Sequence, residues 1–161
     1  MLEPGFTFSL LALFHDIIVG VGGLILILLF HGTFINHLLM RFDRMTTDNL
    51  ANKEYHWVFF HFYISFSFIA LIHVTEVLIW ALIMHQLGLL SNANDAILFA
   101  GSCYTTLGLV QDILPNGWKS LSFIIAFSGL FSLAWTTSIM IGMTDTYRKA
   151  WQMKWSKRKP L

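Results

Sequence analysis

Residues 95–110 read DAILFAGSCYTTLGLV, and this stretch decides the fold because it is apolar yet too short to cross a bilayer. A helix needs about 20 apolar residues to span a hydrocarbon core of about 30 Å, whereas a shorter apolar run suits a re-entrant segment. Asn92 and Asn94 can cap a short helix that starts near Asp95, whose carboxylate favours a helix N-terminus. The helix is expected to end at small and polar residues: Thr105, Thr106 and Gly108.

Three longer apolar segments surround this stretch, at about residues 8–30, 55–84 and 121–143, and each is long enough to span a bilayer. No basic region precedes the first segment and no small-residue cleavage site follows it, so a retained helix is expected rather than a signal peptide. Residues 31–54 are polar and are expected to form a helical extension followed by a loop. The sequence predicts an all-α integral membrane protein with three transmembrane helices and a re-entrant helix and loop between the second and third.

Composition supports the membrane assignment. Of 161 residues, 56% are hydrophobic and 12% are charged, whereas a soluble domain carries about 25% charged residues. The basic residues are not spread as a nucleic-acid-binding face requires, so the lipid bilayer is an expected partner and nucleic acid is not. The single cysteine, Cys103, cannot form a disulfide within the chain.

The basic residues predict an orientation. Residues 31–54 carry three Lys or Arg residues and the segment after Thr144 carries six, whereas residues 85–120 carry only Lys119. The positive-inside rule then places the N-terminus outside and the C-terminus in the cytoplasm. We expect three parts: an N-terminal transmembrane helix with a cytoplasmic loop (1–54), a pore-like module (55–143) and a basic cytoplasmic tail (144–161).

A family resemblance lies in the same region. Residues 102–108, SCYTTLG, resemble the end of the pore helix and the start of the filter in potassium channels. Other residues are similar to the outer helix, loop and inner helix of the bacterial two-transmembrane-pore "ion channel" family: His73, Glu76, Trp80, Ala81, Leu114, Pro115, Trp118, Lys119, Ser128, Gly129 and Ala134 to Thr137. The resemblance implies a pore module in the bacterial inner membrane, here with an extra N-terminal helix. It also implies that Gly129 is a gating hinge, although a packing role explains this glycine equally well.

The filter itself departs from the family pattern. Where the family has Gly-Tyr-Gly-Asp, this chain has Gly-Leu-Val-Gln at residues 108–111. A potassium filter presents rings of backbone carbonyls to the ion, and its path needs left-handed conformations that Gly108 allows but β-branched Val110 resists. The filter-like loop comprises Thr105, Thr106, Leu107, Gly108, Leu109, Val110, Gln111 and Asp112.

Two functions from different classes follow. The first is a potassium-channel-like pore, a homotetramer with an altered filter that is not selective for potassium. The second is a channel-derived accessory subunit that packs in a hetero-oligomeric membrane complex and conducts nothing. The chain shows no nucleophile–base pair and no carboxylate dyad, so an enzyme is not expected.

Ionisable residues inside the apolar segments are further candidates for function. Glu76 and His73 lie one turn apart, and such groups cost about 2.5–3.5 kcal/mol each in a membrane span, so they normally face protein. A proton or metal site is one interpretation, but a buried hydrogen bond to the pore helix or inner helix is favoured. For a second pair, His15 and Asp16, interhelical pairing is favoured over a ligand or proton site.

The seven histidines suggest haem or metal binding, because bis-histidine haem needs only two facing histidines. The sequence has no His-x-x-His-His cluster, however, and five histidines fall near predicted membrane interfaces, where solvated roles are expected: His31, His37, His56, His61 and His85. No metal and no cofactor are therefore expected. Gly20, Gly22 and Gly23 are expected to allow close approach of a neighbouring helix.

The predicted orientation can be tested by cysteine labelling. With Cys103 replaced by serine, a Lys157→Cys variant should react with a membrane-impermeant maleimide only from the cytoplasmic side. Labelling of that cysteine from outside the cell would overturn both the orientation and the re-entrant assignment.

Overall fold

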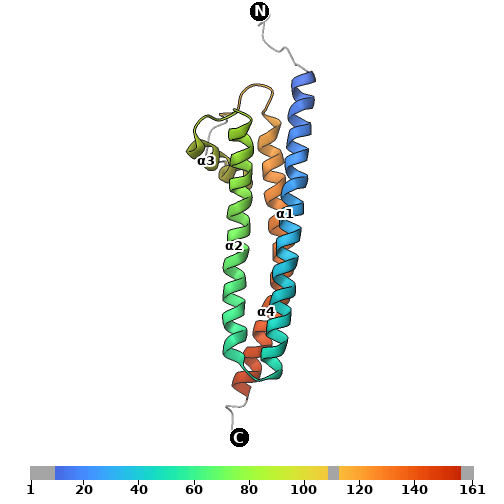
Figure 1. Cartoon of the computed structure of the whole chain (residues 1–161), viewed down its shortest axis with the longest axis vertical. Helices are drawn as coiled ribbons and strands as arrows, with labels where there is room; N and C mark the ends of the chain where they lie inside the picture. The colour runs from blue at the N-terminus through green and yellow to red at the C-terminus, as the bar shows by residue number, and fades with distance from the viewer. Residues whose placement is uncertain (1–9, 109–112, 157–161) are drawn as a thin grey trace, which may run out of the picture. The chain divides into compact units, whose positions relative to one another are not determined.

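The computed structural model describes residues 10–108 and 113–156, with side chains from residue 13 onward. It contains four helices (Figure 1): α1 (Leu10–Ala51), α2 (Tyr55–Gln86), α3 (Ala93–Tyr104) and α4 (Ser120–Ser156). The described residues form no strand. α1, α2 and α4 are each long and apolar enough to cross a membrane. The expectation of an all-α protein with three helices long and apolar enough to span a membrane is confirmed for the described residues.

The helices are longer than the apolar segments predicted. α1 continues to Ala51, so most of the polar stretch after residue 30 is helical and the connection to α2 is only residues 52–54. α4 likewise continues to Ser156, so the described part of the expected tail is helix. Neither extension contains proline, the residue that most strongly breaks a helix, so the helices can continue where hydrophobicity falls.

Three helix ends are closed by the same hydrogen-bonding pattern. After α1 the Glu54 N–H donates to the Asn49 carbonyl at 2.8 Å around Lys53, whose φ is 61°. Equivalent six-residue bonds close α2 around Gly88 and α3 around Thr106, with φ values of 67° and 58°. These are Schellman motifs, in which one left-handed residue satisfies the last carbonyls of a helix.

The described residues pack as two compact units, each containing parts of α1, α2 and α4. The first unit comprises the described residues up to Ile27 and those within Val77–Leu130, and it includes α3. Its core is built around Trp80, whose indole N–H donates to the Ser128 hydroxyl at 2.8 Å. The Trp80 ring lies against Gly23, where a Cβ would overlap it.

The predicted glycine surface on α1 is present in part. A Cβ at Gly20 would displace the tip of the Ile124 side chain, and a Cβ at Gly23 would overlap the Trp80 ring. Gly22, in contrast, has no described atom within 4 Å of where its Cβ would lie. Two of the three glycines therefore permit close packing in this unit.

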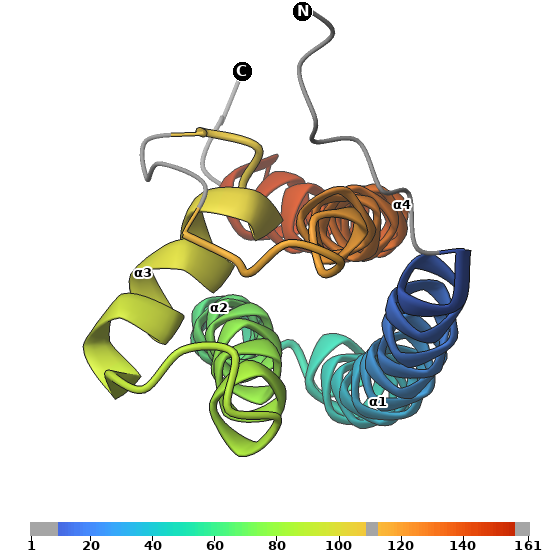
Figure 2. The ribbon, with the colours of Figure 1, turned by 90° about the horizontal axis from the view of Figure 1, so that it is seen from above.

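α3 is a short helix held by its cap and one buried face. The Asn92 side chain accepts a hydrogen bond from the Asn94 N–H at 2.9 Å, as the sequence predicted. Figure 2 shows α3 beside α2 and α4 and away from α1 in this unit. Its buried side chains include Phe99 and Tyr104.

Gly129 lies where the end of α3 meets α4. A Cβ at this position would collide with the backbone carbonyl oxygen of Tyr104, the last residue of α3. This contact supports the packing interpretation of Gly129, because only glycine lets the α3 backbone approach α4 this closely.

The second unit comprises Leu28–Glu76 and the described residues from Phe131 onward. Its core contains Ile35, Phe42, Ile69, Ile72 and Met143. Aromatic rings also pack from two helices, since Tyr147 of α4 lies 4.8 Å from Phe62 of α2 between ring centroids.

The collision at Gly129 gives a stability prediction. Gly129→Ala should lower the free energy of unfolding by about 1–3 kcal/mol, because overpacking forces the backbone apart. Gly142→Ala is a matched control in the same helix, since its Cβ would meet no described atom within 4 Å. The measurement is the thermal midpoint in mild detergent, and equal midpoints for the two variants would contradict the close approach of α3 to α4.

Candidate functional site

The second unit buries a carboxylate in the apolar part of α2. Glu76 is 0% exposed, and its Oε1 lies 2.7 Å from Nδ1 of His31, which is also 0% exposed and belongs to α1. A separation this short is typical of a hydrogen bond in which one partner is charged. The pair satisfies two polar groups that the hydrocarbon interior of a membrane would leave without partners.

Two further side chains extend this contact into a closed ring. The Thr136 hydroxyl of α4 lies 3.3 Å from Nε2 of His31 and 3.1 Å from Nε2 of His73. Nδ1 of His73 lies 3.7 Å from Oε2 of Glu76. Glu76, His31, Thr136 and His73 are called the polar ring below, and they come from three different helices of this unit.

Small and aromatic residues support the ring. The Trp135 ring centroid lies 5.7 Å from that of His31, and Trp135 packs against Gly32, where a Cβ would overlap the indole. Three members of the ring are nine-tenths or more buried, whereas the side chain of His73 is 16% exposed. Access to the polar ring is therefore on the His73 side.

The sequence anticipated part of this arrangement. It placed Glu76 and His73 on one face and expected Glu76 to be buried against protein, and both residues are in the ring. The placement of His31 at a solvated interface is wrong, because this residue is fully buried. α1 continues as an apolar-faced helix through this position, and the buried residues Ile27, His31 and Ile35 recur every four positions. This four-residue spacing in the sequence was the signal that could have identified His31 as a buried residue.

His15 and Asp16, the polar pair of the first unit, are arranged differently from the polar ring. Asp16 is 1% exposed, and its Oδ2 accepts a hydrogen bond from the Ser120 N–H at the start of α4 at 2.8 Å. A carboxylate suits this place because the N-terminus of a helix carries partial positive charge. His15 is exposed and lies edge-on to Trp118, with ring centroids 5.2 Å apart. Of this pair, only Asp16 makes an interhelical hydrogen bond to a described residue.

The described half of the filter-like loop follows α3 directly. Thr105, Thr106, Leu107 and Gly108 are all exposed, whereas Leu109, Val110, Gln111 and Asp112 lie outside the described residues. The Leu107 N–H donates to the Ser102 carbonyl at 3.0 Å, and Gly108 has φ of 63°. The left-handed backbone at Gly108 was anticipated, but the one at β-branched Thr106 was not.

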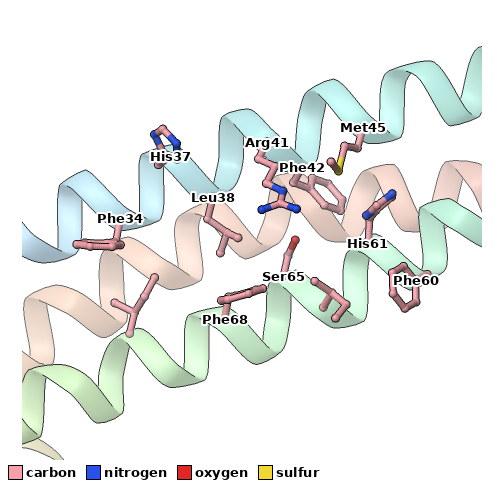
Figure 3. Close-up of a pocket in the computed structure, with 12 residues that line it drawn as sticks. Phe34, His37, Leu38, Arg41, Phe42, Met45, Phe60, His61, Ser65 and Phe68 are labelled. Carbon is pink, nitrogen blue, oxygen red and sulfur yellow. The ribbon is translucent and has the colours of Figure 1, made fainter.

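A cavity of about 470 Å³ lies in the second unit. Figure 3 shows Arg41 of α1 and Ser65 of α2 pointing toward one another across it, among mostly apolar side chains. Its lining residues are Phe34, His37, Leu38, Arg41, Phe42, Met45, Phe60, His61, Ile64, Ser65, Phe68 and Ile72. The cavity is amphipathic, with its polar groups at His37, Arg41, His61 and Ser65.

Comparison with known proteins gives no relative. No family model, no curated protein and no solved structure matches this chain. The resemblance of residues 102–108 and the surrounding positions to the ion-channel family therefore stays a prediction from the sequence.

The polar ring gives a prediction about stability. Glu76→Leu should cost about 3–5 kcal/mol, because it leaves His31 buried without its charged partner. The double variant Glu76→Leu/His31→Leu should recover part of this loss, with a coupling of about 0.5–3 kcal/mol. Thermal midpoints and detergent gel filtration measure the effect.

Glu54→Gln is the matched control, because Glu54 is exposed in the turn between α1 and α2. A Glu76→Leu protein that is as stable as Glu54→Gln would show that the ring contributes nothing to the fold.

Proposed function

We propose that this chain is a subunit of a potassium-channel-type pore whose altered filter does not select potassium. The proposal places α3 as a re-entrant pore helix between the spanning helices α2 and α4, with the loop after it facing the pore. In the same proposal the N-terminus is outside and the C-terminus cytoplasmic in a bacterial inner membrane.

The observation that carries the proposal is the geometry of α3 and its C-terminal end. With 12 residues, α3 is about 18 Å long, which is too short to cross a hydrocarbon core. Its last carbonyl packs directly on Gly129 of α4, and the chain then leaves the helix through left-handed residues at Thr106 and Gly108. A short helix that packs against two spanning segments, lies between them in the chain and ends in an exposed irregular loop is the arrangement a pore loop requires.

Exposed apolar side chains on α3 and in the loop after it are available for assembly. Leu98 of α3 is 62% exposed and Leu107 of the loop is 64% exposed. In a homotetramer these side chains would pack against the neighbouring subunit.

The altered residues set the expected behaviour of the pore. Val110 stands where the family has its second filter glycine, and a left-handed conformation there is strained by about 1–3 kcal/mol in each of four subunits. Leu109 stands in place of the filter tyrosine. A ring of Leu109 and Val110 side chains would form an apolar constriction that blocks ions by dewetting.

The second candidate function is a non-conducting accessory subunit of a larger membrane complex. The missing second glycine favours it, since such a subunit needs the pore fold but no carbonyl stack. Cross-linking and native mass spectrometry in mild detergent distinguish the two, because a four-fold homo-oligomer supports the pore and stoichiometric unrelated subunits support the accessory role.

The filter gives a prediction about conduction. The protein reconstituted in liposomes should show no potassium-over-sodium selectivity, as measured by ion flux with a fluorescent potassium indicator. The triple variant Leu109→Tyr/Val110→Gly/Gln111→Asp should gain selectivity if the protein is a homotetramer, because it restores the glycine and the tyrosine of the family filter.

Gln111→Asp alone is the control, since it adds the acidic residue without changing the backbone path. Strong potassium selectivity in the unaltered protein would refute the role assigned to Leu109 and Val110.

A further inference from the structure

The two imidazoles of the polar ring are oriented alike. His31 and His73 each present Nδ1 to the Glu76 carboxylate and Nε2 to the Thr136 hydroxyl. One side of each imidazole thus faces an acidic group, while the other faces a single hydroxyl that both rings share.

Counting hydrogens shows what this orientation favours. A neutral imidazole carries one N–H, and a hydroxyl has one proton and two lone pairs. With Glu76 ionised, the 2.7 Å contact is a hydrogen bond in which Nδ1–H of His31 donates to Oε1. The Thr136 hydroxyl can then donate to Nε2 of His31 and accept from Nε2–H of His73. A divalent cation that replaces the Nδ1 proton of His31 would be held by the two imidazoles and the carboxylate together, while both Nε2–H groups donate to Thr136.

From this geometry we propose that Glu76, His31 and His73 bind a divalent first-row transition metal ion, with zinc as the preferred ion. Each of the three residues offers one ligand atom within 4.8 Å of those of the other two. Nδ1 is the nitrogen of each histidine that faces the Glu76 carboxylate, so the proposed ligands are the two Nδ1 atoms and a carboxylate oxygen. Two histidines and one glutamate form a ligand set that zinc uses in proteins when a fourth position stays open.

Two of the three distances between donor atoms can be compared with those around a bound ion. With metal–ligand bonds of about 2.0–2.1 Å, the donor atoms around a tetrahedral ion lie roughly 3.3 Å apart. The two Nδ1-to-carboxylate distances are 2.7 Å for His31 and 3.7 Å for His73. They lie on either side of that value, so the Glu76 and His73 side chains would move closer together around an ion.

Thr136 provides the support that metal-bound histidines need. A ligating histidine almost always donates its other N–H to a second group that fixes the ring. Here one hydroxyl oxygen lies within hydrogen-bonding distance of both Nε2 atoms, at 3.1 and 3.3 Å. The partly exposed side chain of His73 gives an ion a route into an otherwise buried site.

Other histidines of the same unit do not share this arrangement. His37 is exposed and His61 half-buried, and both line the cavity of the second unit rather than the polar ring. They therefore serve as controls for non-specific metal binding by imidazole. The site also belongs to a different unit from the filter-like loop, and its test does not depend on conduction.

The experiment uses the full chain in mild detergent, after removal of any affinity tag. Co²⁺ is the spectroscopic probe and Zn²⁺ its competitor. We expect one Co²⁺ per chain, visible d–d absorption bands of a four- or five-coordinate ion, and displacement by Zn²⁺. His73→Gln should weaken binding by about 100-fold or more, and Thr136→Val by about 10–100-fold because the supporting hydroxyl is lost.

The double variant His37→Gln/His61→Gln should leave the spectrum and the stoichiometry unchanged. Since Glu76 and His31 variants can unfold the protein, the decisive variants are the partly exposed His73 and the supporting Thr136, each checked by gel filtration. Zn²⁺ should raise the thermal midpoint of the unaltered protein and leave that of His73→Gln unchanged. Absence of stoichiometric Co²⁺ binding, or binding lost only in the His37/His61 variant, would overturn the proposal.

Discussion

Polar groups inside a membrane-spanning helix must find their partners within the protein, because hydrocarbon offers none. Glu76 is the strongest case in this chain, since a fully buried carboxylate on an apolar helix would otherwise be costly to insert. Its hydrogen bond to His31 and the hydroxyl of Thr136 join α2 to α1 and α4 in the second unit. The first unit follows the same rule, with Asp16 capping α4 and Trp80 bonded to Ser128.

These bonds determine helix register in a way that apolar contacts cannot. Lipid tails are as apolar as leucine, so hydrophobicity alone gives little preference for one helix–helix alignment over another. A hydrogen bond between His31 and Glu76 is directional and is lost if either helix slides by one residue. Glycines complement it, because Gly23 and Gly32 let Trp80 and Trp135 pack against the α1 backbone.

The sequence predicted those features that depend on local pattern. Apolar length located the three spanning helices, Asn92 located the start of α3, and the cost of an intramembrane charge predicted that Glu76 is buried. Features that depend on a distant partner were missed. His31 was assigned to an interface because polar residues follow it, and nothing near it in the chain indicates that Glu76, 45 positions away, is its partner. Sequence separation also hid the role of Thr136, whose neighbours suggested only an inner helix.

Backbone strain at the end of α3 shows how packing and the filter-like loop are connected. Three helices end in Schellman motifs, and at α2 the left-handed position is Gly88, which adopts it without strain. At α3 the same position is Thr106, and a β-branched residue is unusual there. Such strain, on the order of 1–3 kcal/mol, persists only where surrounding contacts fix the backbone. Two of those contacts are the bonds from the loop to the carbonyls of Ser102 and Cys103, and a third is the close approach of Tyr104 to Gly129. The direction in which the chain leaves α3 is therefore set by how this helix packs on α4. A substitution that alters this packing would thus change the conformation of the loop even though the loop sequence is unchanged.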